Sequence, residues 1–389
     1  MEEWKEYKLG EVVIPEKDRI ETSCLDSTSY ISTENMLPDK AGITLSSGVP
    51  SGNAVMFKND DILISNIRPY FKKIWRANRD GGCSADVICL RASNAVDPLF
   101  LYYLLSQDLF FDYVMQGAKG TKMPRGDRNQ IMQWPVLIPS KNEQHIIASI
   151  LSALDEKIEV NRRINDNLEQ QAQALFKSWF VDFEPFRDQP FVESELGMIP
   201  KGWRAGTLSE IANITMGTSP SGASYNVNGE GEVFYQGRAE FGYRFPHRNM
   251  YTTEPKRYAE DGDVLLSVRA PVGDVNIANE RCCIGRGLAA IGSESCPSYI
   301  LYLVKSLKSV FEQYNGEGTV FGSINKKTLE GLRIIVPESK YIERFEKVTN
   351  PLDGQIRCKE EESRRLASLR DTLLPRLMSG ELKVNEIKA

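Results

Sequence analysis

The strongest constraint on this 389-residue chain is a helical pattern that runs from Lys141 to Phe180 without a proline or a glycine. A single helix over this stretch would be about 60 Å long at ~1.5 Å per residue. Helices in globular proteins average only about 11–12 residues. The apolar positions alternate spacings of four and three, which is the 3.5-residue period of a coiled coil. The stretch therefore predicts a long helix that needs a partner helix.

A second copy of this pattern lies 198 residues further along the chain. The string LDEKIE from Leu154 and the string LDGQIR from Leu352 match at that offset. One such helix alone fits a long buried core helix equally well, but two copies at a fixed offset predict that they pair with each other. Polar residues interrupt both apolar seams, and a buried Asn at a seam fixes register at a cost in stability. The predicted helix seam consists of Leu154, Ile158, Asn161, Asn165, Leu168, Leu352, Ile356, Lys359, Ser363 and Leu366.

The correspondence extends beyond the two helices, so the chain is a tandem duplication. The segment Trp4–Val12 corresponds to Trp203–Ile211, and Gly120-Thr121 corresponds to Gly318-Thr319. We expect a first globular domain at residues 1–140, a long helix at 141–182, a linker at 183–202, a second globular domain at 203–338, a second long helix at 339–380 and a C-terminal tail at 381–389.

Each globular domain mixes strand and helix patterns. Asp60–Ile67 and Asp263–Val268 are apolar runs that follow turn-like acidic pairs, which is typical of buried strands. Pro98–Phe111 and Pro297–Phe311 have apolar spacings typical of amphipathic helices, with a proline near each start. The predicted fold class is α+β, with two mixed α/β domains separated by a two-helix antiparallel coiled coil.

Composition narrows the range of functions. The net charge of −5 gives no overall basic character, so a nucleic-acid site would have to be a local patch. The seven cysteines lack the spacing of a disulfide framework, which favours reduced thiols in a cytosolic compartment. With only two histidines, a His-rich metal site is nearly excluded. The N-terminal residues contain no signal peptide or transmembrane run, so we expect a cytoplasmic protein with no membrane partner.

Two motifs that would point to an enzyme are missing from the sequence. There is no GxxxxGK[ST] phosphate loop, and Phe183-Glu-Pro-Phe186 only superficially resembles the tetrapeptide of amino-methyltransferases. The strings Gly285-Arg-Gly287 and Gly316-Glu-Gly318 are more typical of turns than of phosphate cradles. The acidic residues do not group as metal ligands. We therefore predict no catalytic residue and no metal site on this chain.

Basic residues interleaved with aromatic ones gather in Ile64–Arg79, Gly117–Arg128 and Gln236–Arg248. Such sets suit phosphate neutralisation and base-edge recognition, although solvated strand faces over aromatic cores would give the same pattern. Because clusters occur in both repeats, we favour DNA binding. The candidate DNA-binding residues are Arg68, Lys72, Lys73, Arg76, Lys119, Lys122, Arg125, Arg128, Arg238, Arg244, Arg248, Arg269, Arg286, Lys326 and Lys327.

Several motifs together resemble the specificity (S) subunit of Type I restriction–modification systems, over nearly the whole length of the chain. The most specific are Gln170–Phe186 (QQAQALFKSWFVDFEPF), Leu196–Trp203 (LGMIPKGW) and Leu265–Ala278 (LLSVRAPVGDVNIA). Three shorter matches add to the resemblance: Gly120–Pro124, Ile284–Ile291 and Leu369–Leu382.

This resemblance implies a non-catalytic subunit with two target-recognition domains, each reading one half of a split, asymmetric site in double-stranded DNA. It also implies an antiparallel helix pair that sets the spacing and docks two modification (methyltransferase) subunits. S-adenosylmethionine would bind those subunits, and ATP and Mg would bind the restriction (motor–nuclease) subunits, leaving no cofactor on this chain. Two alternatives are a stand-alone DNA methyltransferase or nuclease, and a coiled-coil adaptor whose globular ends bind protein.

Overall fold

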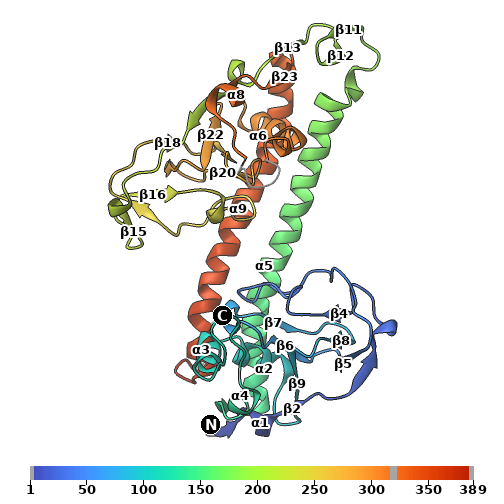
Figure 1. Cartoon of the computed structure of the whole chain (residues 1–389), viewed down its shortest axis with the longest axis vertical. Helices are drawn as coiled ribbons and strands as arrows, with labels where there is room; N and C mark the ends of the chain where they lie inside the picture. Colours follow the sequence, from blue (N-terminus) through green and yellow to red (C-terminus); the bar gives the residue numbers. More distant parts are fainter. Residues whose placement is uncertain (1–3, 316–321, 385–389) are drawn as a thin grey trace. The chain divides into compact units, whose positions relative to one another are not determined.

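The computed structural model describes residues 4–315 and 322–384. The chain forms two compact units: unit 1 is made of residues 1–161 and 361–389, and unit 2 of residues 162–360. Each unit combines a globular domain with parts of two long helices, α5 (Lys141–Phe176) and α9 (Ser339–Met378) (Figure 1). The Gly316–Gly318 string, the Gly318-Thr319 pair and the last five residues of the expected tail lie outside the described residues.

The globular domain of unit 1 contains two four-stranded sheets, in the orders β2-β9-β6-β7 and β3-β5-β8-β4, and a separate antiparallel pair of β1 and β10. Strand β6, from Ile62 to Ser65, is buried along its whole length. It lies between β7 and β9, where the apolar run predicted a buried strand. The strands are β1 (Lys5–Lys8), β2 (Val13–Pro15), β3 (Arg19–Glu21), β4 (Tyr30–Ile31), β5 (Asn53–Phe57), β6 (Ile62–Ser65), β7 (Ile74–Arg76), β8 (Gly81–Cys83), β9 (Val87–Ala92) and β10 (Pro135–Ile138).

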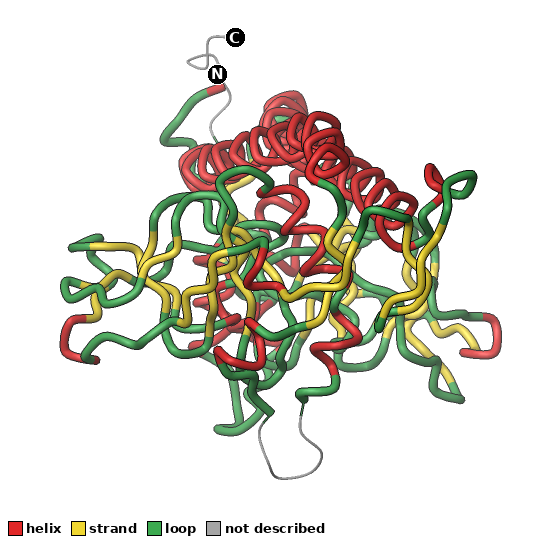
Figure 2. The backbone as a smooth tube through the Cα atoms, turned by 90° about the horizontal axis from the view of Figure 1, so that it is seen from above, coloured by secondary structure: helices red, strands yellow, loops and turns green. Residues whose placement is uncertain are grey.

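The globular domain of unit 2 repeats this design. Its sheets have the orders β14-β22-β19-β20 and β15-β17-β16-β21-β18, and β13 pairs with β23 as β1 pairs with β10. Figure 2 shows strands and short helices in both domains. The strands are β13 (Arg204–Thr207), β14 (Asn213–Met216), β15 (Tyr225–Asn226), β16 (Glu232–Tyr235), β17 (Tyr251–Thr252), β18 (Tyr258–Ala259), β19 (Val264–Ser267), β20 (Val275–Ile277), β21 (Cys282–Ile284), β22 (Leu288–Gly292) and β23 (Arg333–Val336).

The two amphipathic helices expected in the globular domains are each broken in two. In unit 1 the break falls at Ser106 and Gln107, whose side chains bond the carbonyl oxygens of Tyr102 and Leu104. These bonds satisfy carbonyl groups that a continuous helix would have used, so the first helix ends there. The short helices are α1 (Leu9–Val12), α2 (Pro98–Leu105), α3 (Asp108–Gln116), α4 (Arg128–Ile131), α6 (Pro297–Ser306), α7 (Lys308–Glu312) and α8 (Lys326–Glu330).

The segment expected as a linker at 183–202 carries structure of its own. Beyond α5 the chain makes a π-helical turn at Lys177–Val181, and β11 (Phe191–Ser194) and β12 (Gly197–Pro200) form a hairpin. The rings of Phe186 and Trp203 lie 4.9 Å apart, edge to face. The Gln170–Phe186 motif therefore builds part of the aromatic core of unit 2.

The long helices run antiparallel within each unit. In unit 1, Asp155 on α5 binds Arg370 on α9 at 2.7 Å, and Asn161 lies within 3.3 Å of the Ser363 hydroxyl. In unit 2, Asn165 donates a hydrogen bond to the carbonyl oxygen of Ile356 at 3.4 Å. The predicted pairing of the two helices and the α+β fold class are therefore confirmed.

A tyrosine–aspartate hydrogen bond anchors each globular domain to a long helix. Tyr103 on α2 donates to Asp155 on α5 at 2.7 Å, and Tyr302 on α6 donates to Asp353 on α9 at 2.8 Å. The two aspartates are the second residues of the repeated LDEKIE and LDGQIR strings. The repeated strings therefore mark the same anchoring contact in both units.

Candidate nucleic-acid interface

Two basic segments that are far apart in the sequence meet in unit 1. The loop that follows β6 lies against the loop before α4, because the Arg68 N–H bonds the carbonyl oxygen of Pro124 at 2.8 Å. Ile67 and Arg125 form an antiparallel bridge beside it. The first and second predicted basic clusters therefore form one surface, which we call the unit 1 loop pair (residues 66–73 and 117–128).

The unit 1 loop pair exposes two aromatic rings that contact each other at a tilted angle. Tyr70 and Phe71 are 46% and 37% exposed, and their ring centres are 4.6 Å apart. Arg68 and Lys72 flank them in left-handed backbone conformations with φ of +50°. Such strained positions in non-glycine residues concentrate at functional sites. Exposed aromatic rings among cations suit contact with nucleic-acid bases and phosphates.

The candidate cations of unit 1 differ in how freely they could meet a phosphate. The Lys73 ammonium donates to the carbonyl oxygen of Thr33 at 2.7 Å, and burial, followed by the neighbouring Arg68, lowers its pKa. Arg128 likewise donates to the carbonyl oxygen of Ala85. Within residues 4–315 and 322–384, the side chains of Arg68 and Lys122 have no ion pair or hydrogen bond. The remaining candidates form ion pairs: Lys72 with Asp108, Arg76 with Asp60, Lys119 with Asp127, and Arg125 with Asp86.

Unit 2 has an equivalent loop pair (residues 268–273 with 322–324). Arg269 forms a bridge with Ser323, and the Ala270 N–H bonds the carbonyl oxygen of Gly322 at 3.0 Å. Arg269 and Arg286 both line a hollow of about 280 Å³ against this loop pair. Among the described residues, the side chains of Arg269, Arg286 and Lys327 have no ion pair or hydrogen bond. The other exposed candidates pair as Arg238 with Asp274, Arg248 with Glu280, and Lys326 with Glu330.

Arg244 is a wrong candidate. It is only 4% exposed, and its guanidinium group forms ion pairs with Glu169 on α5 and Asp353 on α9. Burial opposes ionisation of Glu169, but Arg244 and Lys305 outweigh it and lower the pKa of this carboxyl group. Arg244 therefore neutralises buried carboxylates and cannot reach DNA in this fold.

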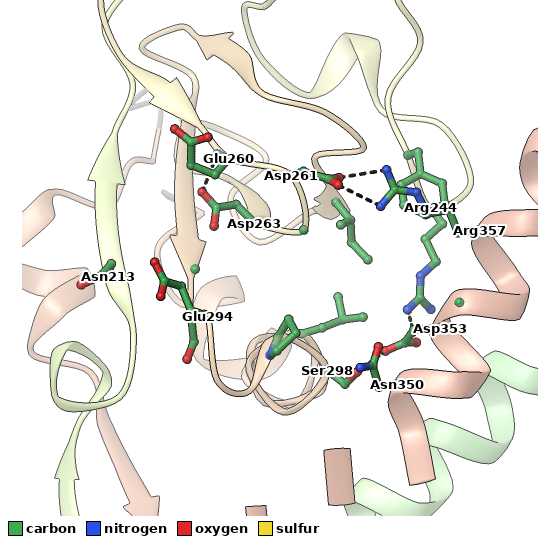
Figure 3. A pocket seen from close by; sticks show the side chains of 18 of the residues that line it. Asn213, Arg244, Glu260, Asp261, Asp263, Glu294, Ser298, Asn350, Asp353 and Arg357 are labelled. Atoms are coloured by element: carbon green, nitrogen blue, oxygen red, sulfur yellow. Dashed lines mark hydrogen bonds and ion pairs between the residues drawn. The ribbon is translucent and has the colours of Figure 1, made fainter. Parts of the chain in front are cut away.

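A cavity of about 530 Å³ lies between α9 and the sheets of unit 2 (Figure 3). Glu260, Asp261, Asp263, Glu294 and Asp353 line it. Arg244 and Arg357 also line the cavity and pair with Asp353 and Asp261, so the lining keeps an excess of carboxyl groups that would repel a phosphate backbone. Among the described residues no group of three or more His, Cys, Asp or Glu has a metal-binding arrangement.

Three residues of the predicted seam are fully buried, and two of them are the asparagines. Asn161, Asn165 and Ile356 are at most 1% exposed. The other seam residues are half-buried: Leu154, Ile158, Leu168, Leu352, Lys359, Ser363 and Leu366.

Sequence reasoning missed three residues near Arg286. Ser219, Tyr225 and Gln236 line a second hollow of about 380 Å³ together with Arg286. Gln236 lies at the start of a predicted basic cluster, but Ser219, Tyr225 and Gln236 are uncharged, so the clustering of positive charge does not mark them.

Comparisons with known proteins agree with this architecture. A family model described as the Type I restriction modification DNA specificity domain matches residues 1–170 and 200–356. The putative type I restriction enzyme MjaX specificity subunit of Methanocaldococcus jannaschii is 34% identical over 299 residues, which cover 75% of this chain and 69% of that protein. The type I restriction enzyme HindI specificity subunit of Haemophilus influenzae is 25% identical over an alignment covering 98% of this chain and 100% of that protein.

The crystal structure of a Type-I restriction-modification system S subunit from M. genitalium shares the fold. Its TM-score is 0.59 at 19% identity, with 96% of each chain covered. No helix in the described part of the chain is long and apolar enough to cross a membrane. Because the family model matches most of its residues, the chain belongs to the family of the Type I restriction–modification DNA specificity domain.

Proposed function

We propose that this chain is the DNA-reading subunit of a type I restriction–modification complex, in which each globular domain reads one half of a bipartite, asymmetric site. The observation that carries the proposal is the duplicated loop pair. Each repeat presents unpaired cations beside a hydrogen-bonded pair of loops, on a chain whose net charge is −5. Cations concentrated on one loop surface attract the phosphate backbone even when the whole chain is acidic.

In this proposal the chain itself performs no chemistry. Two modification subunits would dock on the paired helices and supply S-adenosylmethionine, and restriction subunits would supply ATP and Mg. All seven cysteines are free thiols, which supports an assignment to the reducing cytoplasm.

A domain exchange tests the division of labour. Residues 1–140 are replaced by the first domain of a related specificity subunit, and the methylated sites are mapped in cells that also express the modification subunits. We expect the half-site read by the first domain to change and the half-site read by the second domain to stay the same. If both half-sites change together, or if neither does, the modular proposal is wrong.

A second experiment separates recognition from catalysis. The purified chain is incubated with S-adenosylmethionine and duplex DNA, with and without the modification subunits. We expect methyl transfer only when those subunits are present. Transfer by the chain alone would instead establish a stand-alone enzyme, and loss of all DNA binding in the complete complex would favour a protein adaptor.

A further inference from the structure

Arg286 is an exposed residue that lines two neighbouring hollows in the globular domain of unit 2. It lies between β21 and β22, in the string Gly285-Arg286-Gly287, and it lines both the 380 Å³ and the 280 Å³ hollows. Its side chain is exposed, and among the described residues its guanidinium group has no hydrogen bond or ion pair. A free guanidinium group between two open hollows is available to a ligand.

The backbone of Arg286 is packed tightly against two neighbouring chain segments. A Cβ atom on Gly287 would lie 2.7 Å from the carbonyl oxygen of Gln236, and one on Gly217 would lie 2.1 Å from that of Gly285. Only glycine permits such close approach of three chain segments. The Arg286 N–H also donates to the Ser219 hydroxyl at 3.2 Å. The base of the arginine side chain is therefore fixed while its tip is free.

Gln236 stands next to Arg286 in the same hollow and is oriented by hydroxyl groups. Its carbonyl oxygen lies 3.3 Å from the Ser219 hydroxyl and 3.4 Å from that of Tyr225, and its amide nitrogen donates to Ser219 at 3.2 Å. These bonds leave one amide hydrogen for a ligand. Arginine pairs with the O6 and N7 edge of guanine, and the one remaining amide hydrogen of Gln236 suits a single base acceptor such as N7 of a purine.

The positions of unit 1 that correspond to Arg286 and Gln236 have the same backbone hydrogen bonding but carry different side chains. The Gly285 N–H bonds the carbonyl oxygen of Tyr235 at 2.8 Å, and the Ser84 N–H bonds that of Ile31 at 2.8 Å. In this correspondence Ala85 takes the place of Arg286. Ser32 takes the place of Gln236. Two domains that share a backbone arrangement but differ in the side chains at these positions can recognise different half-sites.

We propose that Arg286 and Gln236 read base edges in the half-site bound by the second domain, with Arg269 beside them on a phosphate. This inference rests on the proposed function and adds its specificity-determining residues. The division follows the usual one, in which phosphate contacts position a protein and base contacts specify the sequence.

The test measures which duplexes the complete complex of this chain and its modification subunits selects from a library randomised across the site. Arg286→Lys keeps the positive charge but removes the guanidinium group, which can form two parallel hydrogen bonds with one base. We expect it to reduce the preference for one base at one position of the second half-site by about 5- to 150-fold, with the salt dependence of binding unchanged. We expect Gln236→Ala to relax a neighbouring position by a similar factor.

Two controls make the result decisive. Lys327→Ala removes another unpaired cation of the same domain and should weaken all sequences alike, reducing the salt slope by about one. The first half-site serves as an internal reference and should not change. Equal base preferences in Arg286→Lys and the parent complex, or a change confined to the first half-site, would overturn the inference. If the parent complex selects no sequence at all, the proposed function fails, and the inference fails with it.

Discussion

At the scale of single residues, charge serves the fold as often as it serves binding. Arg244 was a candidate for DNA contact because it lies among aromatic and basic neighbours. Its actual partners, Glu169 and Asp353, are 75 and 109 residues away in sequence. Local composition carries no information about partners at that distance, so burial of this arginine could not be predicted. The other site candidates stay predictions, and the structure brings them together as loop pairs that the sequence did not reveal.

Replacing Arg244 with alanine should destabilise unit 2 strongly. The substitution leaves the largely buried Asp353 carboxylate without its cation and leaves Glu169 with Lys305, and breaking a buried pair by removing one partner costs about 3–5 kcal/mol. The matched control is Arg248→Ala, which removes an exposed ion pair with Glu280 worth about 1 kcal/mol or less. The measurement is chemical unfolding followed by circular dichroism. Similar losses in the two variants would contradict the structural role assigned to Arg244.

Glu346 should make the stability of unit 2 depend on pH. Burial raises its pKa from 4.5 to about 7, while the Tyr299 N–H donates to it at 2.6 Å. Between these pH values the folded chain holds a proton that the unfolded chain has released. The free energy of unfolding should therefore fall as pH rises from about 4.5 to about 7. Glu346→Gln should remove this pH dependence of the free energy of unfolding. Glu343→Gln, at an exposed position on the same helix, should retain it. Parallel pH profiles for all three proteins would refute the assignment.

At the scale of elements, regular patterns were predictable and local interruptions were not. The 3.5-residue period correctly predicted that α5 and α9 pair. The break between α2 and α3 depends on side-chain bonds from Ser106 and Gln107 to preceding carbonyl groups, which apolar spacing does not encode. The segment 183–202 was expected as a linker because it lacks periodicity, yet its hairpin and Phe186 give it structure.

The seam asparagines should lower stability in exchange for register. Within the described part of the chain, the buried amide oxygens of Asn161 and Asn165 have no hydrogen-bond partner. Asn161→Leu and Asn165→Leu should each raise the free energy of unfolding by about 1 kcal/mol, because an unsatisfied buried group is removed. Asn167→Leu, on the exposed face of α5, should stay within about 0.5 kcal/mol of the parent protein. A marked loss of stability in the seam variants would show that the asparagines stabilise the helix pair.

At the scale of the whole molecule, the two long helices are expected to act as a ruler. Adding one heptad to both α5 and α9 keeps the seam in phase and lengthens the pair by about 10 Å. That length is about three base pairs, which also rotate the DNA by roughly a third of a turn. A straight helix drifts only ~20° per heptad, so the protein does not follow this rotation.

The extended protein should therefore bind the original site much more weakly. A spacer lengthened by about three base pairs should recover only part of the loss. The measurement is binding by the complete complex to duplexes that differ only in spacer length. Unchanged affinity with an unchanged spacer preference would show that the helices do not set the spacing, and that partner subunits or flexible connections do.

The division of unit 1 into residues 1–161 and 361–389 has a consequence for synthesis on the ribosome. At about 5–20 residues per second, roughly 10–40 s pass while residues 162–360 are added. During that interval Ile147 and Leu151 lack Leu374 and Leu377, which belong to the same core. Unit 2 is translated as one stretch and is complete before unit 1, although it starts later. A chain that stops after residue 360 would thus contain all of unit 2 but would lack part of the core of unit 1.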